Sequence, residues 1–385
     1  MNAFARDRLT WTAYVVLCWF AYLQAAPSLV VPHLRRELQL DYSTGGLYVT
    51  AFAAGSTVAG VLSAKLEGTL GRRPLLWSAA VLMGAGTIGL TAGRTAEMTL
   101  GSVLAMGLAG GLILATLQAA LADHHGDLRA VALTELNVAA SCGYLLLVGT
   151  LSLTAQLGAG WRIALLGSLA VPVVMWWHSR SLPMEASTPL QASQGDGLPN
   201  PVRVAAAIVA CTTAVEWSVT AWGATFVQEM TCVSADTAVS LMAGYFGGFL
   251  AGRLLGSRLA LHHEPTRLLG WALGLTALGF AVVWTSSEPA LAAAGLVLLG
   301  LGIGNLFPMA LSAAVAIAPE RAGHVSGRVV AASAGAVLLA PVTVGVLADA
   351  TTLRAALSVV PILLAASAAG LIVLHQVTRS APSRS

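Results

Sequence analysis

Glu216 is the ionisable residue whose position in this sequence most strongly suggests chemistry. It stands twelve residues into an apolar run of 25 residues, 204–228. Thr213 and Thr220 lie three residues before it and four after it, so all three side chains share one helical face. Burial disfavours the charged form of a carboxyl, so we expect Glu216 to be neutral when occluded and to ionise when water reaches it. A proton carrier must behave in this way; contact with a cationic or hydroxyl-bearing ligand and a structural hydrogen bond are the alternatives.

Other polar side chains recur at helical spacing in apolar runs. In 131–155, Asn137, Ser141 and Tyr144 share a face with Thr134. Packing or hydrogen bonding between helices is the alternative role for such residues, and aromatic rings also fill core positions. The candidates for solute contacts are Gln24, Tyr22, Asn137, Ser141, Tyr144, Thr213, Trp217, Thr220, Trp222 and Asn305.

The composition indicates whether the protein surface is surrounded by water or by lipid. The 385 residues are 57% hydrophobic and only 10% charged, against about 25% charged residues in soluble domains. We therefore expect membrane lipid to be the main partner of the surface. The net charge of +3 is small and its basic residues are scattered, which argues against nucleic-acid binding. The four cysteines lack metal-binding spacing, so we predict neither a metal site nor a cofactor.

The apolar runs are long enough to cross a bilayer, which takes roughly 20 residues per helix. Residues 179–203 are rich in Pro, Ser and Gly and predict a cytoplasmic linker between two six-helix bundles, 1–178 and 204–385. The predicted fold is an all-α membrane protein. Its twelve expected helices are 10–33, 45–66, 75–92, 99–122, 131–155, 162–178, 204–228, 239–261, 268–285, 290–316, 328–348 and 355–375.

The distribution of basic residues predicts orientation. Fifteen of the twenty Lys and Arg residues fall on one side when both termini are placed in the cytoplasm. We therefore expect a multi-pass protein of the cell (inner) membrane with both termini cytoplasmic. The first 26 residues resemble a signal peptide, but the apolar run continues past Ala26 and we expect no cleavage.

The two halves also repeat. With an offset of 192, "AASCG" at 139–143 falls on "AASAG" at 331–335, and Gly55 falls on Gly247. With an offset of 193, "GLAGG" at 107–111 falls on "GLGIG" at 300–304. A nearly constant offset across several segments indicates a duplicated six-helix unit.

Twelve helices, the duplication, the central cytoplasmic linker and inward termini together resemble the major facilitator superfamily. The run "AKLEGTLGRRP" is similar to the family's loop motif, with Gly71, Arg72 and Arg73 matching and Gly68 in place of its Asp. The resemblance implies a cytoplasmic latch at this loop and at Arg253 and Arg258 of "GRLLGSRL". A role in topology alone is the alternative for these arginines. Glu135, near the cytoplasmic end of its run, is expected to gate or to pair with an arginine.

The resemblance also implies a solute site at mid-membrane between the halves and transport by alternating access. Drug/proton antiporters usually carry an Arg and a Gln where this chain has Val103 and Met106, and a Gly-Pro pair where it has Gly143-Tyr144. These differences from the antiporter motifs weaken the support for a drug/proton antiporter. The runs "GYFGGFLAGRLLG" and "GLGIGNLFPMAL" instead resemble fucose-permease-like and related small-solute members.

We therefore expect a secondary active transporter, and not an enzyme, that moves a small neutral or cationic solute. The chain has no G-x-x-x-x-G-K-[ST] run, so we expect the proton gradient to supply the energy, through Glu216. No arginine or lysine stands at the depth of Glu216, so we expect no buried ion pair there. We expect a monomer. The alternatives are a drug or metabolite efflux antiporter and, in a different class, a transporter-like receptor or sensor.

Overall fold

The computed structural model describes residues 4–180, 182, 184, 200–317 and 321–380, and the regular structure in these ranges is entirely helical. The chain forms two compact units, one of residues 1–40 and 47–190 and one of residues 41–46 and 191–385. The predicted linker 179–203 lies largely outside the described residues. The predicted all-α architecture is confirmed.

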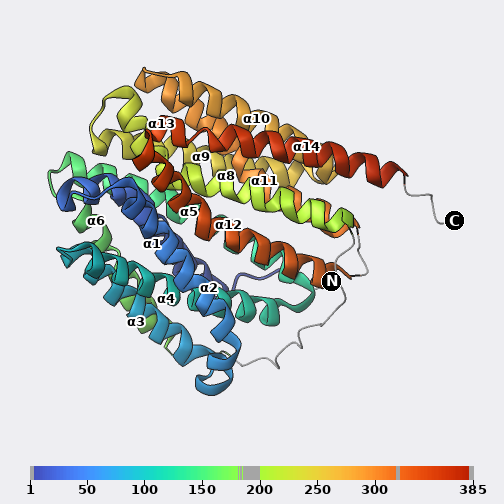
Figure 1. Ribbon diagram of the computed structural model, residues 1–385. Helices are drawn as coiled ribbons and strands as arrows, with labels where there is room; N and C mark the ends of the chain where they lie inside the picture. Colours follow the sequence, from blue (N-terminus) through green and yellow to red (C-terminus); the bar gives the residue numbers. More distant parts are fainter. Residues whose placement is uncertain (1–3, 181, 183, 185–199, 318–320, 381–385) are drawn as a thin grey trace. The chain divides into compact units, whose positions relative to one another are not determined.

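The helices of the first unit pack mainly as the pairs α3–α4 and α1–α5 (Figure 1). The helix α2 begins in residues 41–46, which cluster with the second unit, and continues in the first. The elements are α1 (Arg8–Leu38), α2 (Tyr42–Leu70), α3 (Arg72–Ala92), α4 (Ala96–His125), η1 (Gly126–Leu128), α5 (Arg129–Gln156), α6 (Trp161–Gly167) and α7 (Ala170–Ser179).

In the second unit, α8 lies beside α12 and α14, and α11 packs against α9 and α10 (Figure 1). The elements are α8 (Asn200–Thr231), α9 (Ala235–Leu259), α10 (Pro265–Thr285), α11 (Pro289–Ile317), α12 (Ala322–Ala350), α13 (Leu353–Ala356) and α14 (Val359–Ser380). Ten helical stretches among the described residues are long and apolar enough to span a membrane, and one of them, Ala96–Gln156, holds both α4 and α5.

Two predicted helices, 162–178 and 355–375, are each broken near the start. The first is divided into α6 and α7 and the second into α13 and α14. Pro172 and Pro361 are each the third residue after their break. Because a proline ring clashes with the carbonyl four residues earlier, the clash falls at Ser168 and Leu357, where each helix is interrupted. The unbroken prediction was wrong at both places.

Close helix packing confirms the duplication and corrects its register. A Cβ on Gly107 of α4 would lie 2.0 Å from the Phe52 carbonyl oxygen of α2, and one on Gly300 of α11 would lie 2.1 Å from that of Tyr245 in α9. Both pairs are related by an offset of 193. Gly55 and Gly248 obey the same offset, since each faces a backbone carbonyl of the neighbouring helix. The match of Gly55 to Gly247 was therefore one residue out of register.

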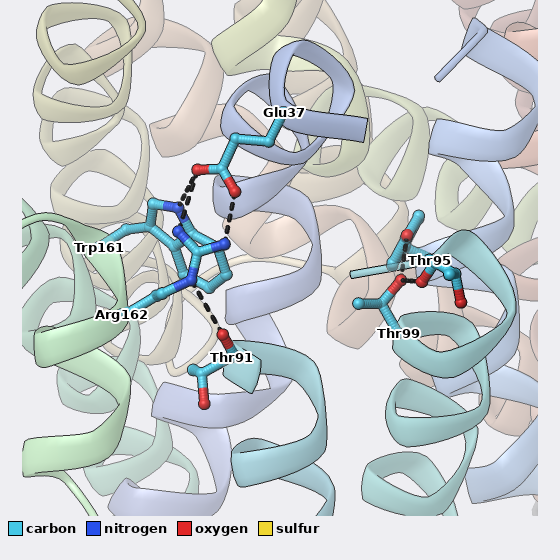
Figure 2. A network of polar contacts seen from close by, with 7 residues as sticks. Glu37, Thr91, Thr95, Thr99, Trp161 and Arg162 are labelled. Atoms are coloured by element: carbon cyan, nitrogen blue, oxygen red, sulfur yellow. Dashed lines mark hydrogen bonds and ion pairs between the residues drawn. The ribbon is translucent and has the colours of Figure 1, made fainter. Parts of the chain in front are cut away.

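A cluster of polar contacts ties three helices of the first unit together at one end (Figure 2). Arg162 Nη2 forms an ion pair with Glu37 Oε2 at 2.5 Å, and Arg162 Nε donates to the Thr91 carbonyl at 2.9 Å. Trp161 Nε1 donates to the same carboxylate. The start of α6 is thereby held to the ends of α1 and α3.

Candidate functional site

Glu216 lies half-buried in α8, opposite an aromatic face of α9. Three residues, 232–234, join the two helices, so they run antiparallel. The hydroxyls of Thr220 and Tyr245 lie 2.9 Å apart and fix the register of the pair. Glu216 is one turn before Thr220, so it stands level with Phe249, one turn after Tyr245. The register of the Thr220–Tyr245 contact thus puts Glu216 and Phe249 at the same level of the α8–α9 pair.

Arg253 brings a positive charge to this level. It follows Phe249 by one turn, and its Cζ lies 4.4 Å from the centre of the Phe249 ring. The guanidinium therefore folds back over the ring toward the level of Glu216, and its charge acts on the Glu216 carboxyl. No arginine or lysine stands at the helical depth of Glu216, but the long side chain of Arg253 brings its charge close enough to act on that carboxyl.

The other candidates on α8 differ in their surroundings. The Thr213 hydroxyl is buried and has no hydrogen-bond partner among the described residues. Trp217 is half-buried beside Glu216. Trp222 is buried, and its Nε1 donates to the Pro341 carbonyl at 2.9 Å, which fastens α8 to α12. Thr213 and Trp217 therefore remain candidates for solute contacts, whereas the indole N–H of Trp222 already has a structural partner.

Asn305 of α11 makes structural contacts. Its Nδ2 donates to the Gly252 carbonyl of α9 at 2.7 Å and to the Leu301 carbonyl at 3.3 Å. Gly256 leaves room for this side chain, since a Cβ there would lie 1.7 Å from Asn305 Oδ1. These contacts favour the alternative role for Asn305, a hydrogen bond between helices, over a solute contact.

In the first unit, Gln24 and Tyr144 meet. The Tyr144 hydroxyl donates to Gln24 Oε1 at 2.8 Å, across α1 and α5. Ser141 and Asn137 continue the polar face of α5 away from this pair, and each donates to a carbonyl of its own helix four residues back. We call Gln24, Tyr144, Ser141 and Asn137 the α1–α5 polar group.

Tyr22 lies apart from that group. Its hydroxyl is 2.7 Å from Thr150 Oγ1 and donates to the Ala164 carbonyl at 2.7 Å, toward α6. Tyr22 stands two positions before Gln24 on α1, and side chains two positions apart on a helix point in directions about 200° apart. Tyr22 therefore serves to hold α6 against α1.

The loop motif between α2 and α3 forms a buried charge cluster. Gly71 has φ +81°, which a residue with a Cβ rarely adopts, and it precedes α3. The buried Arg72 donates through Nε to Glu67 and through Nη2 to Asp123, both at 2.8 Å. The family's motif usually has an Asp at the position of Gly68. In this chain Glu67 and Asp123 provide the acidic partners of Arg72 instead. The neighbouring Arg73 is half-buried and points elsewhere, and Arg258 is exposed in the last turn of α9.

Replacing Arg72 with glutamine is expected to destabilise the first unit by about 2 kcal/mol. The change leaves Glu67 without its buried counter-charge, and the loss falls below the range of fully buried pairs because Asp123 is half-exposed. Thermal unfolding in detergent measures the effect. The exposed Arg129→Gln is the control, and equal midpoints for the two variants would contradict this role of Arg72.

A second polar cluster joins α1, α4 and α5. Glu135 accepts hydrogen bonds from Arg6 at 2.8 and 2.6 Å and from the Tyr14 hydroxyl at 2.9 Å. Asp7, His124 and His125 each offer a potential metal ligand, and these atoms lie within 4.8 Å of one another. Both carboxylate oxygens of Asp7 already have partners within the protein. Its Oδ1 accepts hydrogen bonds from the backbone N–H and the hydroxyl of Thr10, and its Oδ2 lies 2.7 Å from His124 Nε2.

Asp7→Ala is expected to destabilise the first unit by about 1 kcal/mol, because it removes the N-cap of α1. Burial raises the Asp7 pKa, but bonds from Thr10 and the charge of His124 outweigh this and hold the pKa below its usual value. The stabilisation is therefore present above about pH 4 and is lost as the pH falls through the lowered pKa. Unfolding midpoints between pH 3 and 7 measure it.

Asp7→Asn separates the cap from the charge. Asparagine also caps helices well, so we expect most of the stability at pH 7 to remain while the acid-dependent part disappears. A variant that keeps the pH dependence of the wild type would show that another group titrates. Asp127→Ala, in the neighbouring η1, is the matched control for the loss of an exposed carboxyl.

Sequence reasoning missed Tyr245 and Phe249 at the site. They lie on α9 with Arg253 at a spacing of four, in "GYFGGFLAGR", which is the spacing of one helical face. That periodicity was visible in the sequence. What the sequence lacked was the register between α8 and α9, which the contact between Thr220 and Tyr245 supplies.

Comparisons with known proteins agree with this architecture. A family model described as Major Facilitator Superfamily matches residues 10–230 and 205–385. A bacterial homologue of the human lysosomal transporter Spinster, in an inward-facing and occupied conformation, aligns with a TM-score of 0.80 at 13% identity over 97% of this chain and 98% of its own. A D-xylose–proton symporter aligns with a TM-score of 0.77 at 15% identity over 95% of each chain. The nucleoside transporter NupG aligns with a TM-score of 0.70 at 15% identity, covering 96% of this chain and 99% of its own. A search of curated proteins found no match.

Proposed function

Because the chain belongs to the Major Facilitator Superfamily and is a multi-pass membrane transporter, not an enzyme, we propose that it moves a small neutral polar solute by alternating access, coupled to protons through Glu216. The observation that carries this proposal is a half-buried glutamate on α8 whose carboxyl is within range of the charge of an arginine on the next helix. An ionisable residue at membrane depth is expensive to keep, and transporters place such residues along ion and solute pathways.

The chemistry of the pair supports a proton-carrying role. Ionised Glu216 is stabilised by the charge of Arg253, whose guanidinium is held in place on the Phe249 ring. When Glu216 takes a proton, it no longer attracts the guanidinium of Arg253. Protonation therefore changes which groups α8 and α9 present to one another. A change of contacts that depends on proton binding is what couples a proton to a conformational step.

The polar groups of the two units favour a neutral solute. While Glu216 is ionised, the opposite charge of Arg253 offsets it, so neither charge is left uncompensated in that state. In the second unit, Thr213 offers a hydroxyl without a partner among the described residues and Trp217 offers an aromatic ring. In the first unit, Gln24 and Tyr144 carry amide and hydroxyl groups. Groups of this kind recognise hydroxyl-bearing, uncharged molecules. The similarity in fold to a D-xylose–proton symporter supports the same class.

A ligand screen tests the solute class. Purified protein in detergent is heated with neutral sugars and polyols, nucleosides, amines and organic acids, and stabilising compounds are then tested for exchange in proteoliposomes. We expect stabilisation by neutral hydroxylated compounds. Stabilisation by organic acids alone would contradict the proposal, exchange of hydrophobic drugs alone would indicate an efflux antiporter, and binding without exchange would indicate a receptor.

Tyr144→Phe is expected to weaken binding of the solute about threefold to tenfold, the effect of roughly one hydrogen bond. Tyr22→Phe is the matched control, because it removes the same hydroxyl from the same unit at a place outside the α1–α5 polar group. Titration of binding by the thermal shift measures both variants. Equal losses of affinity would show that Tyr144 acts through stability and does not contact the solute.

A further inference from the structure

An open groove of about 950 Å³ runs along the first unit between α3 and the broken helix pair α6–α7. On α3 its lining repeats at helical spacing through Arg73, Trp77, Val81, Gly84 and Ile88. Pro172, Val173 and Trp176 of α7 line the opposite wall. The break that Pro172 causes thus lies on the wall of the groove. This groove is independent of the proposed transport site.

The groove is apolar along its length and basic at one end. Val81, Ile88 and Val173 expose 73%, 52% and 66% of their surface, as expected for side chains that meet hydrocarbon. From Arg73 to Ile88, α3 rises about 22 Å, which is more than the ~15 Å hydrocarbon depth of one leaflet. Small residues, Gly84 and Ala85, keep the middle of the groove open. Its shape and lining match an acyl chain.

Two polar groups at the basic end of the groove have no hydrogen-bond or ion-pair partner in the described part of the chain. Trp77 is nine-tenths buried in the groove wall, and its indole N–H has no hydrogen-bond partner there. Arg73 lines the same end, whereas its neighbour Arg72 takes both acidic partners of the loop. Trp176 adds a second indole at this end. Arginine and indole N–H groups are suited to a phosphate at the membrane interface.

The second unit carries a related pair of residues at a different place on its helix. The offset of 193 that relates Gly86 to Gly279, both packed tightly on the following long helix, places Thr266 and Gly270 where the first unit has Arg73 and Trp77. Arg267 and Trp271 stand one residue further along α10, and the Arg267 Cζ lies 5.1 Å from the centre of the Trp271 ring. Arg267 is thus in contact with its own tryptophan, whereas Arg73 makes no such contact in the described part of the chain.

We propose that the α3–α7 groove binds one anionic phospholipid of the cytoplasmic leaflet, with its phosphate on Arg73 and one acyl chain along Val81, Gly84 and Ile88. The excess of Lys and Arg in the segments expected on the cytoplasmic side predicts that the Arg73 end of the groove faces the cytoplasm. Anionic lipids of that leaflet attract basic residues. The phosphate accepts hydrogen bonds from the Arg73 guanidinium.

Native mass spectrometry of the full-length protein tests the site. Delipidated protein in mild detergent is titrated with phosphatidylglycerol, with phosphatidylcholine and with inorganic phosphate. We expect one tightly retained phosphatidylglycerol, weaker retention of phosphatidylcholine and no protection by free phosphate. Arg73→Gln is expected to weaken the affinity for phosphatidylglycerol about fivefold, the effect of roughly one arginine at a membrane surface. Arg129→Gln, an exposed arginine outside the groove, is expected to have no effect.

A second variant tests the apolar part of the groove. Ala85 is exposed and lines the groove, so Ala85→Trp fills it without entering the core. We expect it to abolish the tightly retained lipid, while Val61→Trp on the exposed face of α2 leaves the lipid bound. Retention of phosphatidylglycerol by Arg73→Gln and Ala85→Trp at the wild-type level would overturn the proposal. Equal affinities for phosphatidylglycerol and phosphatidylcholine would overturn the assignment to an anionic lipid.

Discussion

Glu216→Gln is expected to abolish accumulation of solute against its gradient while leaving exchange of solute across the membrane intact. Glutamine keeps the size and the hydrogen-bonding capacity of a protonated glutamate but cannot release a proton. Transport steps that need only the neutral form therefore continue, and steps driven by the pH gradient stop. Proteoliposomes loaded with unlabelled solute measure exchange by uptake of labelled solute, and an imposed pH gradient measures accumulation.

Glu288→Gln is the matched control, because Glu288 is an exposed glutamate in the loop before α11. It should accumulate solute as the wild type does. Loss of both exchange and accumulation in Glu216→Gln would show that Glu216 contacts the solute. Normal accumulation would show that another group carries the proton.

Gly107→Ala and Gly300→Ala are expected to destabilise the two units by about 1–3 kcal/mol each. The new methyl group would lie 2.0 Å from the Phe52 carbonyl oxygen in the first case and 2.1 Å from the Tyr245 carbonyl oxygen in the second. Both obstacles are backbone atoms, so the paired helices must move apart, which costs packing that membrane helices depend on. Thermal unfolding in detergent measures the loss.

Gly101→Ala on α4 and Gly274→Ala on α10 are matched controls, since no atom lies within 4 Å of a Cβ at either position. They should be neutral or slightly stabilising, because alanine favours a helix by up to about 1 kcal/mol. Gly300→Ala should also impair transport, because moving Tyr245 displaces the partner of Thr220 beside Glu216. A Gly300→Ala protein with wild-type stability and transport would contradict the tight packing of α9 on α11.

Most of the fold could be predicted from the sequence because lipid imposes a simple rule. A helix that crosses hydrocarbon must be long and apolar, so its position is visible in a single run of residues. The ends of the helices were less visible. Asp7 caps α1, which begins at Arg8, two residues before the predicted start at residue 10, and α8 begins at Asn200, four residues before the predicted start at residue 204. The breaks after α6 and α13 had a visible cause in Pro172 and Pro361, which a hydropathy pattern ignores.

The candidate site was less predictable, because it depends on contacts between helices. Periodicity along one helix places Glu216 and Thr220 on the same face of α8, but it carries no information on the register between α8 and α9, which the contact between Thr220 and Tyr245 supplies. Polar residues also looked alike in the sequence while their partners differ. The side chain of Asn305 donates a hydrogen bond to the backbone of α9, and that of Tyr22 donates one to the backbone of α6. Gln24 and Tyr144 instead form a hydrogen bond with each other.

Proton coupling through Glu216 is tested most directly by the movement of protons that accompanies the solute. Proteoliposomes containing a pH-sensitive dye receive the solute with no other gradient present. We expect the wild-type protein to change the internal pH when solute enters, and Glu216→Gln to carry the solute with no change in internal pH. If Glu216→Gln changes the internal pH to the same extent as the wild type, Glu216 is not the proton carrier.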